Sequence, residues 1–481
     1  MEQTSSAAYP NILVADYVKK ARVASPEILM KAENFLNVGY QKLLTFERPG
    51  GGFDWWGNGE PLVWLSAYGL QEFNDMAKVS PIDKGVITRT QAWLMKQREK
   101  DATWGKIGAT HGESIERMGD PKLLLTSYVV WSLLDSGAKK DDLKKSVDYI
   151  RAGIQKVDNA YILALAANAL AAYDAKDDSV HEVLQKLENH QKDLPEIKAL
   201  CYPAGGQSLS YSRGDSLTVE TTALTALAII RSGQFTTSAN KALMYLVKAK
   251  DASGTWGSTQ ATILSLKALV AGMSGSSIKG KVPFTIAING KEVQNGEVNE
   301  ENSDILQMFD LKEHTKVGDN EVSIKVAGET SLMYQIVARH FAPWKKLAAP
   351  TAPALDVRVE YDRTKLSTKD MLRAKATLKY NGTVPTYMVI VDLGIPPGFT
   401  VDAGDFAEVV KAKKIEKFTV TSRQVTLYLG DVKQGDVKEF EYTLKPKYPI
   451  KAQTPATVAY EYYTPANRAT AKPVELVVSE K

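Results

Sequence analysis

Apolar residues recur at the spacing of an α-helix through the first half of the chain. Leu62, Leu65, Leu70 and Phe73 form one such set, and residues 159–173 are almost wholly apolar and rich in alanine. The first set is typical of a helix with one buried face, whereas the second suits a helix that is buried on several sides. Up to about residue 272 the pattern predicts about eleven or twelve helices and no strand.

Aromatic turns punctuate this helical region at intervals of roughly 50 residues or a multiple of that. Residues 52–57 read Gly-Phe-Asp-Trp-Trp-Gly, residues 103–105 Thr-Trp-Gly and residues 254–257 Gly-Thr-Trp-Gly, while residues 206–211 are a degenerate copy. We interpret these aromatic side chains as packing between successive helical hairpins rather than as the lining of a pocket. Because stacked hairpins bury their apolar faces only against neighbours, about six of them are expected to close into an α/α toroid of inner and outer helices.

From about residue 280 the apolar residues alternate with polar ones, which is the period of a β-strand. Residues 283–288 lead into Asn289-Gly290, the strongest short signal for a hairpin, and residues 322–326 and 332–341 are predicted as further strands. A sheet this small has open edges and one uncovered face. We therefore expect it to complete a β-sandwich with strands that lie outside this chain.

A stretch rich in Pro and Ala at residues 345–354 is typical of a linker. After it, about seven or eight alternating segments separated by Gly and Pro turns predict an antiparallel β-sandwich, with a short helix near residues 406–412. The predicted division is a helical toroid at 1–275, a partial β-domain at 276–344, the linker at 345–354 and a β-sandwich at 355–481.

Composition narrows the classes of function. A net charge of +4 over 481 residues, without a cluster of Lys and Arg interleaved with aromatic residues, argues against nucleic acid as a partner. No apolar run approaches about 18 to 20 residues, so no transmembrane segment is predicted. The single cysteine, Cys201, and five histidines without metal-binding spacing predict neither a metal site nor a cofactor.

The first residues of the chain, Met-Glu-Gln-Thr-Ser-Ser-Ala-Ala-Tyr-Pro-Asn, do not look like a natural start. They lack the charged and apolar segments of a signal peptide, and the apolar helical pattern begins at once at Ile12. Nor are they a polar tail that the domain could ignore. We interpret Met1 as an internal residue of a longer protein.

The order of these regions, together with three short motifs, resembles the C-terminal half of the alpha-2-macroglobulin and complement thioester family. Met1-Glu2-Gln3 fits the end of the family motif Gly-Cys-x-Glu-Gln. Residues 387–399 resemble the Met-Val-Ile-Val-Asp segment of the family's receptor-binding domain, and residues 460–465 resemble its closing Tyr-rich strand. The resemblance covers essentially the whole chain. It implies a thioester domain, half of a CUB-like domain and a receptor-binding domain, in that order.

The resemblance also implies that the chain is part of a broad-spectrum protease trap. When a Cys displaces the side-chain amide of a Gln, the product is a thioester, whose thiolate leaves readily when an amine or hydroxyl attacks. Gln3 is then the acyl donor, with Glu2 beside it, and the Cys that would precede Met1 is absent from this chain. Cys201 lies about 200 residues away and is no substitute for it.

The implied partners are target proteases and the other domains of the full-length protein. In the family, cleavage of a bait region releases the thioester domain, which then captures the protease covalently. Such a group survives only where water is excluded, so it is expected at a domain interface before cleavage. The implied location of the parent protein is extracellular, periplasmic or on the cell surface, and no signal peptide is recognised in this chain.

His111 is a second candidate residue, in the segment Gly-Ala-Thr-His-Gly-Glu at 108–113. In the complement branch of the family, a histidine in this region attacks the thioester to form an acyl-imidazole, and the released thiolate acts as general base toward hydroxyl acceptors. Members without that histidine prefer amines. The alternative is a loop histidine on a Gly-rich turn, because the residues that flank His111 are not a clean match to the family.

Two other classes of function stay open. α/α toroids also form terpene cyclases, but a cyclase needs a proton-donor or diphosphate-binding motif, and the nearest acidic run, residues 174–178, lies in a polar loop. An adhesion or structural protein would use the toroid as a spacer. The cyclase alternative leaves the two β-regions unexplained. Protection of a protease from large but not small substrates would favour the trap over both.

Overall fold

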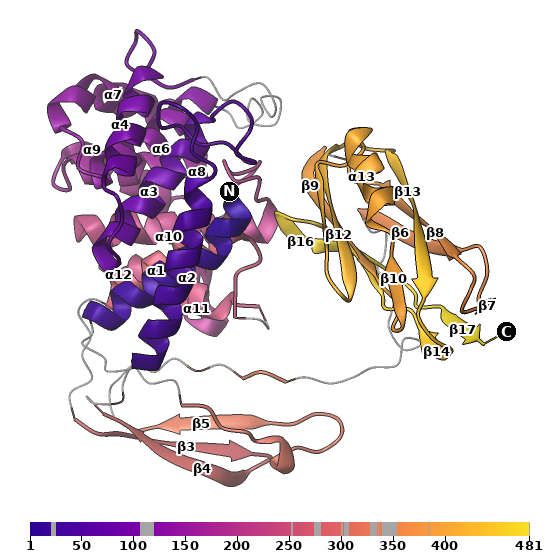
Figure 1. Cartoon of the computed structure of the whole chain (residues 1–481). Coiled ribbons are helices and arrows are strands. Elements are labelled where there is room, and N and C mark those ends of the chain that lie inside the picture. Colours follow the sequence, from indigo (N-terminus) through magenta and orange to yellow (C-terminus); the bar gives the residue numbers. More distant parts are fainter. Residues whose placement is uncertain are drawn as a thin grey trace. The chain divides into compact units, whose positions relative to one another are not determined.

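The computed structural model describes residues 1–20, 26–105, 120–251, 254–273, 280–299, 302, 307–327, 334, 336–338, 354–383 and 385–480. Over these residues the chain is helical up to residue 273, apart from one small hairpin, and mainly β-structure afterwards (Figure 1). The change of hydrophobic period near residue 272 therefore marks a real change of structure.

Eleven helices are described before residue 274, which agrees with the number that the apolar pattern predicts. They are α1 (Glu2–Lys20), α2 (Pro26–Leu44), α3 (Val63–Val79), α4 (Gly85–Lys96), α6 (Pro121–Asp135), α7 (Lys140–Gly153), α8 (Ala160–Tyr173), α9 (Asp178–Glu188), α10 (Gly214–Ser232), α11 (Thr236–Lys248) and α12 (Thr259–Met273).

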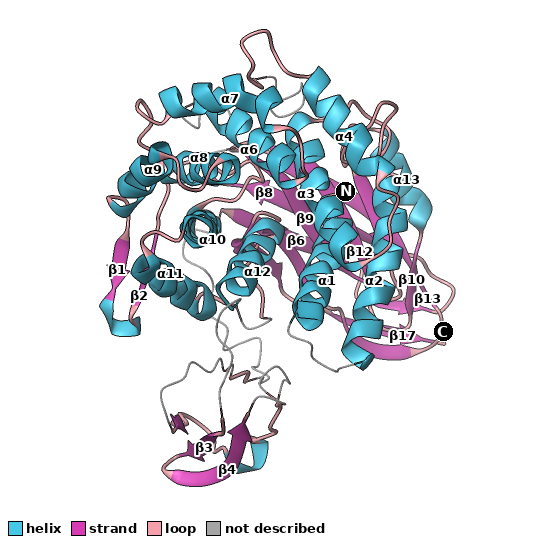
Figure 2. Ribbon diagram, turned by 90° about the vertical axis from the view of Figure 1, so that its left-hand side faces the viewer, coloured by secondary structure: helices cyan, strands magenta, loops and turns pink. Residues whose placement is uncertain are grey.

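These helices form an inner and an outer layer (Figure 2). α8 is an inner helix that is buried on nearly all sides, and its Asn168 donates a hydrogen bond to the carbonyl oxygen of Leu224 on α10 at 2.8 Å. α9 is an outer helix with a single buried face, formed by Val180, Val183, Leu184 and Leu187. α1 packs against α3 on one side and α12 on the other, so the first inner helix meets the last and the ring closes.

Two of the aromatic turns pack as the repeat predicts. Phe53 is fully buried, and its ring lies against that of Phe73 on α3 with a centroid distance of 5.4 Å. Trp104 is also buried: its indole Nε1 donates to the carbonyl oxygen of Leu94 at 2.8 Å, and its backbone N–H donates to Thr126 Oγ1 at 3.0 Å. The turn at Trp104 thus ties the end of α4 to α6, and the packing interpretation is confirmed for these two aromatic residues.

The prediction that the helical region contains no strand is wrong. β1 (Lys192–Leu194) and β2 (Ala199–Cys201) pair antiparallel around the 3-10 helix η1 (Pro195–Ile197). Each strand has only three residues, so neither is long enough to show a two-residue period in the sequence. Cys201 ends β2 as a buried free thiol, and burial raises its pKa.

The segment after residue 280 forms a three-stranded antiparallel sheet in the order β4-β3-β5. Asn289 and Gly290 make the predicted turn between β3 and β4, with φ angles of 52° and 81° that Asn and Gly adopt more readily than other residues. The strand predicted at residues 332–341 falls largely outside the described residues. The elements of this segment are β3 (Val282–Ile288), β4 (Lys291–Val298), the 3-10 helix η2 (Lys312–His314) and β5 (Val322–Val326).

The last region is a mainly antiparallel β-sandwich. Its two large sheets have the orders β10-β13-β8-β6 and β11-β12-β9-β15-β16, and a smaller sheet has the order β14-β17-β7. Apolar side chains that alternate along these strands fill one core, to which Phe406 of the predicted short helix also belongs. The elements are β6 (Leu355–Tyr361), β7 (Lys365–Ser367), β8 (Leu372–Tyr380), β9 (Thr386–Gly394), β10 (Phe399–Val401), α13 (Ala403–Lys411), β11 (Lys417–Val420), β12 (Gln424–Val432), β13 (Val437–Pro446), β14 (Ile450–Gln453), β15 (Thr457–Glu461), β16 (Thr464–Ala471) and β17 (Glu475–Ser479).

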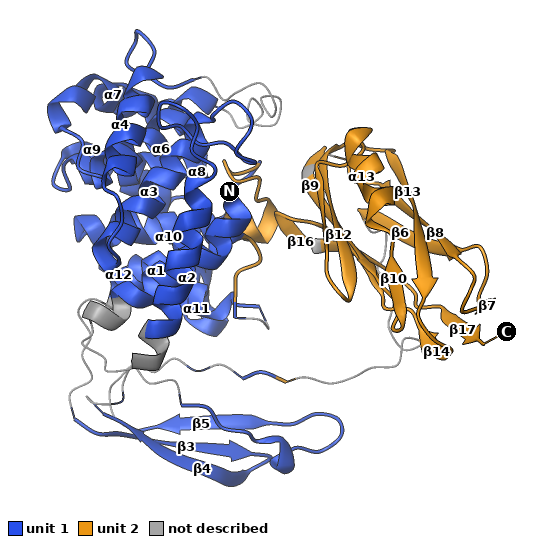
Figure 3. Cartoon of the chain, in the orientation of Figure 1, with its two compact units in different colours: residues 1–206, 218–254, 259–337 blue, residues 207–217, 255–258, 338–481 orange. Residues whose placement is uncertain are grey.

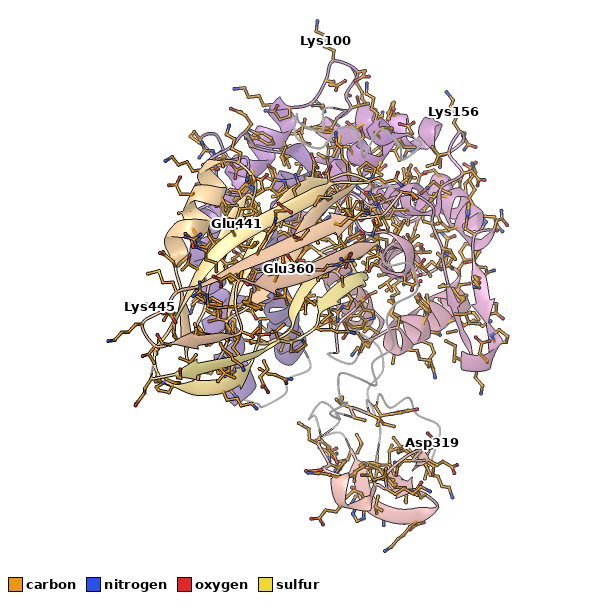
Figure 4. The ribbon with its side chains drawn as sticks, turned by 90° about the vertical axis from the view of Figure 1, so that its right-hand side faces the viewer. Lys100, Lys156, Asp319, Glu360, Glu441 and Lys445 are labelled. Atoms are coloured by element: carbon orange, nitrogen blue, oxygen red, sulfur yellow. The ribbon has the colours of Figure 1, made fainter. Side chains whose placement is uncertain are left out.

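Charged side chains cover the outer face of one sheet of the sandwich. Figure 4 shows Glu360 of β6 and Glu441 of β13 on that face, and both residues are exposed. Lys375 of β8 pairs with Glu439 across the same sheet at 2.9 Å. Because exposed ion pairs contribute little to stability, the sandwich depends mainly on its apolar core.

The described chain divides into two compact units (Figure 3). One holds residues 1–206, 218–254 and 259–337, and the other holds residues 207–217, 255–258 and 338–481. The predicted boundaries near 275, 344 and 354 follow changes in sequence pattern instead, and residues 345–353 of the predicted linker lie outside the described residues. The four-part division stays a prediction.

Candidate functional site

The first turn of α1 is buried in the helical region. Met1 and Glu2 are only 5% and 4% exposed, and Gln3 beside them is half-buried. The carbonyl oxygen of Met1 accepts the N–H of Ser5 at 3.1 Å, and the amino group of Met1 donates to the carbonyl oxygen of Trp55 at 2.6 Å. The Glu-Gln pair is therefore held in a defined helical turn.

Helix α3 packs closely against this turn. A Cβ atom at Gly69 would lie 2.6 Å from Met1 Cε, nearer than real Cβ atoms approach other atoms, so only glycine fits there without movement of Met1. Ser5 is fully buried, and its hydroxyl shares a hydrogen bond with the hydroxyl of Tyr68. The Ser5–Tyr68 bond thus fixes the first turn of α1, two residues after Gln3, onto α3.

A second acidic side chain, Glu72 of α3, lies fully buried near the same turn. Neither of its carboxyl oxygens has a hydrogen-bond partner among the described residues. Burial raises the pKa of Glu72 to about 8 against the lowering effects of Ser5 and the Met1 amino group, and Asp75 adds to the rise. The carboxyl group is therefore largely uncharged at neutral pH.

Further along α1, a largely buried ion pair joins three inner helices. Lys267 of α12 lies 2.9 Å from Asp75 Oδ2 on α3 and donates to the hydroxyl of Tyr9 on α1 at 3.3 Å. Tyr9 in turn donates to the same carboxylate oxygen at 2.7 Å. Burial would raise the pKa of Asp75, but Lys267 and Lys78 outweigh it and hold that pKa well below its usual range. The pair therefore fixes α1 at the point where the ring closes.

A primary amide such as that of Gln3 does not react by itself, so this turn needs a nucleophile to become a reactive group. Cys201, the single cysteine of the sequence, ends β2 and lies on neither α1 nor α3. The described residues contain no group of three His, Cys, Asp or Glu side chains that could hold a metal ion. The turn thus presents the Gln3 amide, and neither α1 nor α3 supplies a cysteine to it.

The acidic run at residues 174–178 serves the ends of two helices. Asp177 caps α9 by accepting the N–H of Ser179 at 2.9 Å, and it pairs with Arg151 of α7 at 2.6 Å. Asp174 accepts the N–H of Lys176 at 3.0 Å. Since these carboxylates already have partners at helix ends, the run gives no support to a cyclase site.

Sequence reasoning proposed Glu2 and Gln3 as site residues, and the structure places both in the first turn of α1. It missed the residues that pack around this turn. Glu72 stands in an apolar stretch of helical spacing, which was the one available signal that an acidic residue would be buried. The partnership of Asp75 with Lys267 left no trace in the sequence. His111 falls in residues 106–119, outside the described part of the chain.

The described chain begins with a Glu-Gln turn in a ring of helices, and β-domains follow the ring. This is the arrangement of a protein with a thioester-containing domain. The chain belongs to the alpha-2-macroglobulin family. The family model for the A-macroglobulin TED domain matches residues 1–271, more than half of the chain, and the model for the A-macroglobulin receptor binding domain matches residues 385–473.

Two curated relatives match almost the whole chain. Ovostatin from Gallus gallus is 24% identical over 499 aligned residues, which cover 99% of this chain and 33% of ovostatin. Thioester-containing protein 1 allele R1 from Anopheles gambiae is 23% identical and covers 96% of this chain and 34% of that protein. The chain thus spans about a third of the length of these relatives.

Solved structures agree with the family at the level of fold. Native alpha-2-macroglobulin from Escherichia coli, in a structure from domain MG7 to the C-terminus, superposes with a TM-score of 0.66 at 14% identity over 99% of this chain and 72% of that one. Salmonella alpha-2-macroglobulin reacted with methylamine gives a TM-score of 0.67 at 14% identity over 99% of this chain and 30% of that one. The predicted order of a helical toroid and then a receptor-binding β-sandwich is confirmed. No helix in the described residues is both long and apolar enough to span a membrane.

Proposed function

We propose that the chain is the C-terminal part of a protease-trapping macroglobulin, with Gln3 as the acyl donor of an internal thioester. The observation that carries the proposal is the burial of the Glu2-Gln3 turn at the start of the region that matches the TED domain. A half-buried Gln3 on a turn fixed by hydrogen bonds is held ready for attack by a neighbouring thiolate. The thiol would belong to a Cys immediately before Met1 in the parent protein.

The physical basis of capture is the difference between two leaving groups. A thiolate leaves an acyl carbon far more readily than an amide nitrogen does, so the thioester transfers its acyl group to amines or hydroxyls of a trapped protein. Partial burial of the turn limits hydrolysis before activation, because water must reach the acyl carbon. In the parent protein, cleavage of an upstream bait region would expose the group to its target.

We further propose that the sheet β4-β3-β5 is half of a CUB-like domain, completed by strands of the parent protein. β4 and β5 each have one open edge within this sheet. Large apolar residues of the same segment are exposed, including Met308 at 83%, Tyr334 at 63% and Ile336 at 55%. Open edges and uncovered apolar side chains are expected where part of a sandwich is missing.

The proposed partners are target proteases and the remaining domains of the parent protein, and the proposed location is outside the cytoplasm, either extracellular or periplasmic. Both follow from the family, whose relatives include an ovostatin and a thioester-containing protein. In the full-length parent, trapping predicts that a captured protease loses activity toward large substrates but keeps it toward small ones.

The thioester is tested by a variant in which Gly-Cys precedes Met1, so that the motif Gly-Cys-Met-Glu-Gln is complete. Formation of the thioester expels one ammonia, so the intact mass should fall by that amount, and methylamine should then label Gln3 and release one reactive thiol. Hydrolysis would instead convert the side chain of Gln3 to a carboxylate, which peptide mapping detects. Gly-Ser in place of Gly-Cys and Gln3→Asn are the matched controls. A folded Gly-Cys variant with neither change would contradict the proposal.

His111 is proposed as the residue that directs acyl transfer to hydroxyl groups. In the Gly-Cys variant, His111→Ala should move acceptor preference from glycerol toward methylamine, because the acyl-imidazole route would be lost. The ratio of the two adducts, measured by mass spectrometry, checks this. An unchanged ratio would remove His111 from the mechanism and leave the role of Gln3 untouched.

A further inference from the structure

Glu72 is a buried acidic group that neither the fold nor the proposed thioester chemistry accounts for. It is fully buried on an inner helix, and both of its carboxyl oxygens lack a hydrogen-bond partner among the described residues. Two polar pairs along the same contact, by contrast, are matched by hydrogen bonds: Ser5 with Tyr68, and Tyr9 with Asp75. A buried polar group without partners destabilises the fold and calls for an explanation.

We propose that Glu72 is a positioning residue for Gln3: an uncharged buried carboxyl that lets the first turn of α1 rest against α3, and whose ionisation would release that turn. The proposal rests on the assignment of Gln3 as acyl donor. The contact is geometric, since the first turn reaches α3 through the Ser5–Tyr68 hydrogen bond and through Met1 at Gly69. Glu72 follows Tyr68 by four residues and Gly69 by three on α3, so it shares the helix face that meets the first turn, and its side chain is fully buried.

The charges around Glu72 favour its neutral form over its ionised form. Glu2, on the first turn itself, lies near enough to raise the pKa of Tyr68, as Glu72 also does. An ionised Glu72 would therefore place a second negative charge in the same buried region, opposed by the Ser5 hydroxyl and the amino group of Met1. The titratable and charged groups that act on Glu72 or on its neighbours Tyr68, Tyr9 and Asp75 come from four helices. They are the Met1 amino group, Glu2 and Tyr9 on α1, Tyr68, Asp75 and Lys78 on α3, Tyr128 on α6, and Lys267 on α12.

The pH dependence has a defined direction. The pKa of Glu72 is about 8 while the first turn of α1 packs against α3, and about 4.5 when the turn has opened and water reaches the carboxyl. Between these pH values the packed state binds a proton that the open state has lost. The opening equilibrium of the first turn therefore increases as pH rises above about 4.5, and it becomes constant above about pH 8. With these values the opening equilibrium of the first turn should increase about 50-fold between pH 6 and pH 8.

Hydrogen–deuterium exchange of the whole chain, read by mass spectrometry, tests the proposal. The peptide that covers residues 2–9 should lose about 50-fold in protection factor between pH 6 and pH 8, after correction for intrinsic exchange. Glu72→Gln keeps the size of the side chain but cannot ionise, so its protection should change less than about threefold over that range. Glu33→Gln, on the exposed face of α2, is the matched control and should follow the unmodified chain. A peptide from α9 reports any global loss of structure.

A constant protection factor in the unmodified chain would overturn the proposal, whether or not Glu72→Gln folds. So would an equal pH dependence in Glu72→Gln, since a merely structural role of the side chain would not remove the titration. The measurement needs no thioester. Its failure is therefore distinct from a failure of methylamine to label Gln3 in the Gly-Cys variant, and each result can stand alone.

Discussion

Glu72 of the helical ring and Glu461 of the sandwich are both buried glutamates, but their surroundings differ. Glu461, 3% exposed at the end of β15, accepts hydrogen bonds from Thr386 Oγ1 and Asn467 Nδ2, both at 3.1 Å, and from the hydroxyl of Tyr380 at 3.4 Å. Glu72 is fully buried and has no such partner among the described residues. The sandwich thus surrounds the carboxyl of Glu461 with hydrogen-bond donors. The helical ring buries the carboxyl of Glu72 near the proposed reactive turn without such donors among the described residues.

The comparison separates two uses of a buried polar group. A carboxyl with matched donors offsets its own desolvation and specifies how the strands around it pack. A carboxyl without donors is kept neutral instead, which makes its region sensitive to pH. Asp75 lies between these two cases, because it is largely buried but has Lys267 as a direct partner.

The largest expected effect is that of Glu72→Gln on the pH dependence of global stability. Since the pKa of Glu72 is raised from 4.5 to about 8 on folding, the free energy of unfolding falls as pH rises between these values. Glutamine removes that loss, so the stability of Glu72→Gln relative to the unmodified chain should improve by about 4 to 5 kcal/mol between pH 4.5 and pH 9. Urea denaturation at the two pH values measures the difference. Equal pH profiles would erase the contrast drawn between Glu72 and Glu461.

A smaller loss is expected when the ring-closing ion pair is broken. Lys267→Met leaves Asp75 buried with only Lys78 and Tyr9, and should lower the free energy of unfolding by about 2 to 3 kcal/mol. Lys78→Met is the matched control, because Lys78 pairs with the same carboxylate but its own side chain is 55% exposed. Its loss should lower the free energy of unfolding by less than about 1 kcal/mol. Thermal and urea unfolding compare the two variants. Equal losses would mean that the buried position of Lys267 has no special weight.

The smallest effect is expected in the sandwich. Glu461→Gln replaces one acceptor oxygen with an NH₂ group, so one of the donors around it loses its partner, at a cost of about 1 to 2 kcal/mol. Thr386→Val removes one donor instead and should cost about 1 kcal/mol. Both values come from urea unfolding of the full chain. A loss near zero for Glu461→Gln would show that its hydrogen bonds do not compensate its burial as the comparison assumes.

Much of the fold was predictable because its signals are local. The helical spacing of residues such as Leu65 and Phe73, the aromatic turn at Trp104 and the Asn289-Gly290 hairpin all depend on neighbours in sequence. The small β1–β2 hairpin was missed because three residues per strand carry no readable period. The paired Glu2 and Gln3 were found through the family motif, not through any property of the residues themselves.

The supporting part of the candidate site was not predictable in the same way. Ser5 and Tyr68 lie 63 positions apart in the chain, and Tyr9 and Lys267 lie 258 apart. Each of these residues has an ordinary place in its own helix, and only the packing of α1 against α3 and α12 brings them together. The apolar spacing around Glu72 was a weak signal for burial, but acidic side chains are rarely buried, so a carboxyl without hydrogen-bond donors could not be predicted from it.

The sequence by itself determined where helices give way to strands, where the turns fall, and that a Glu-Gln pair opens the first helix. The tertiary structure decided that Glu2 is buried and Gln3 half-buried, that Glu72 has no hydrogen-bond partner among the described residues, and that Lys267 pairs with Asp75 where the ring closes. The physical reason is the range of the forces involved. Hydrophobic periodicity and turn geometry act over a few residues, whereas the desolvation and pairing of charges depend on which distant helices come into contact.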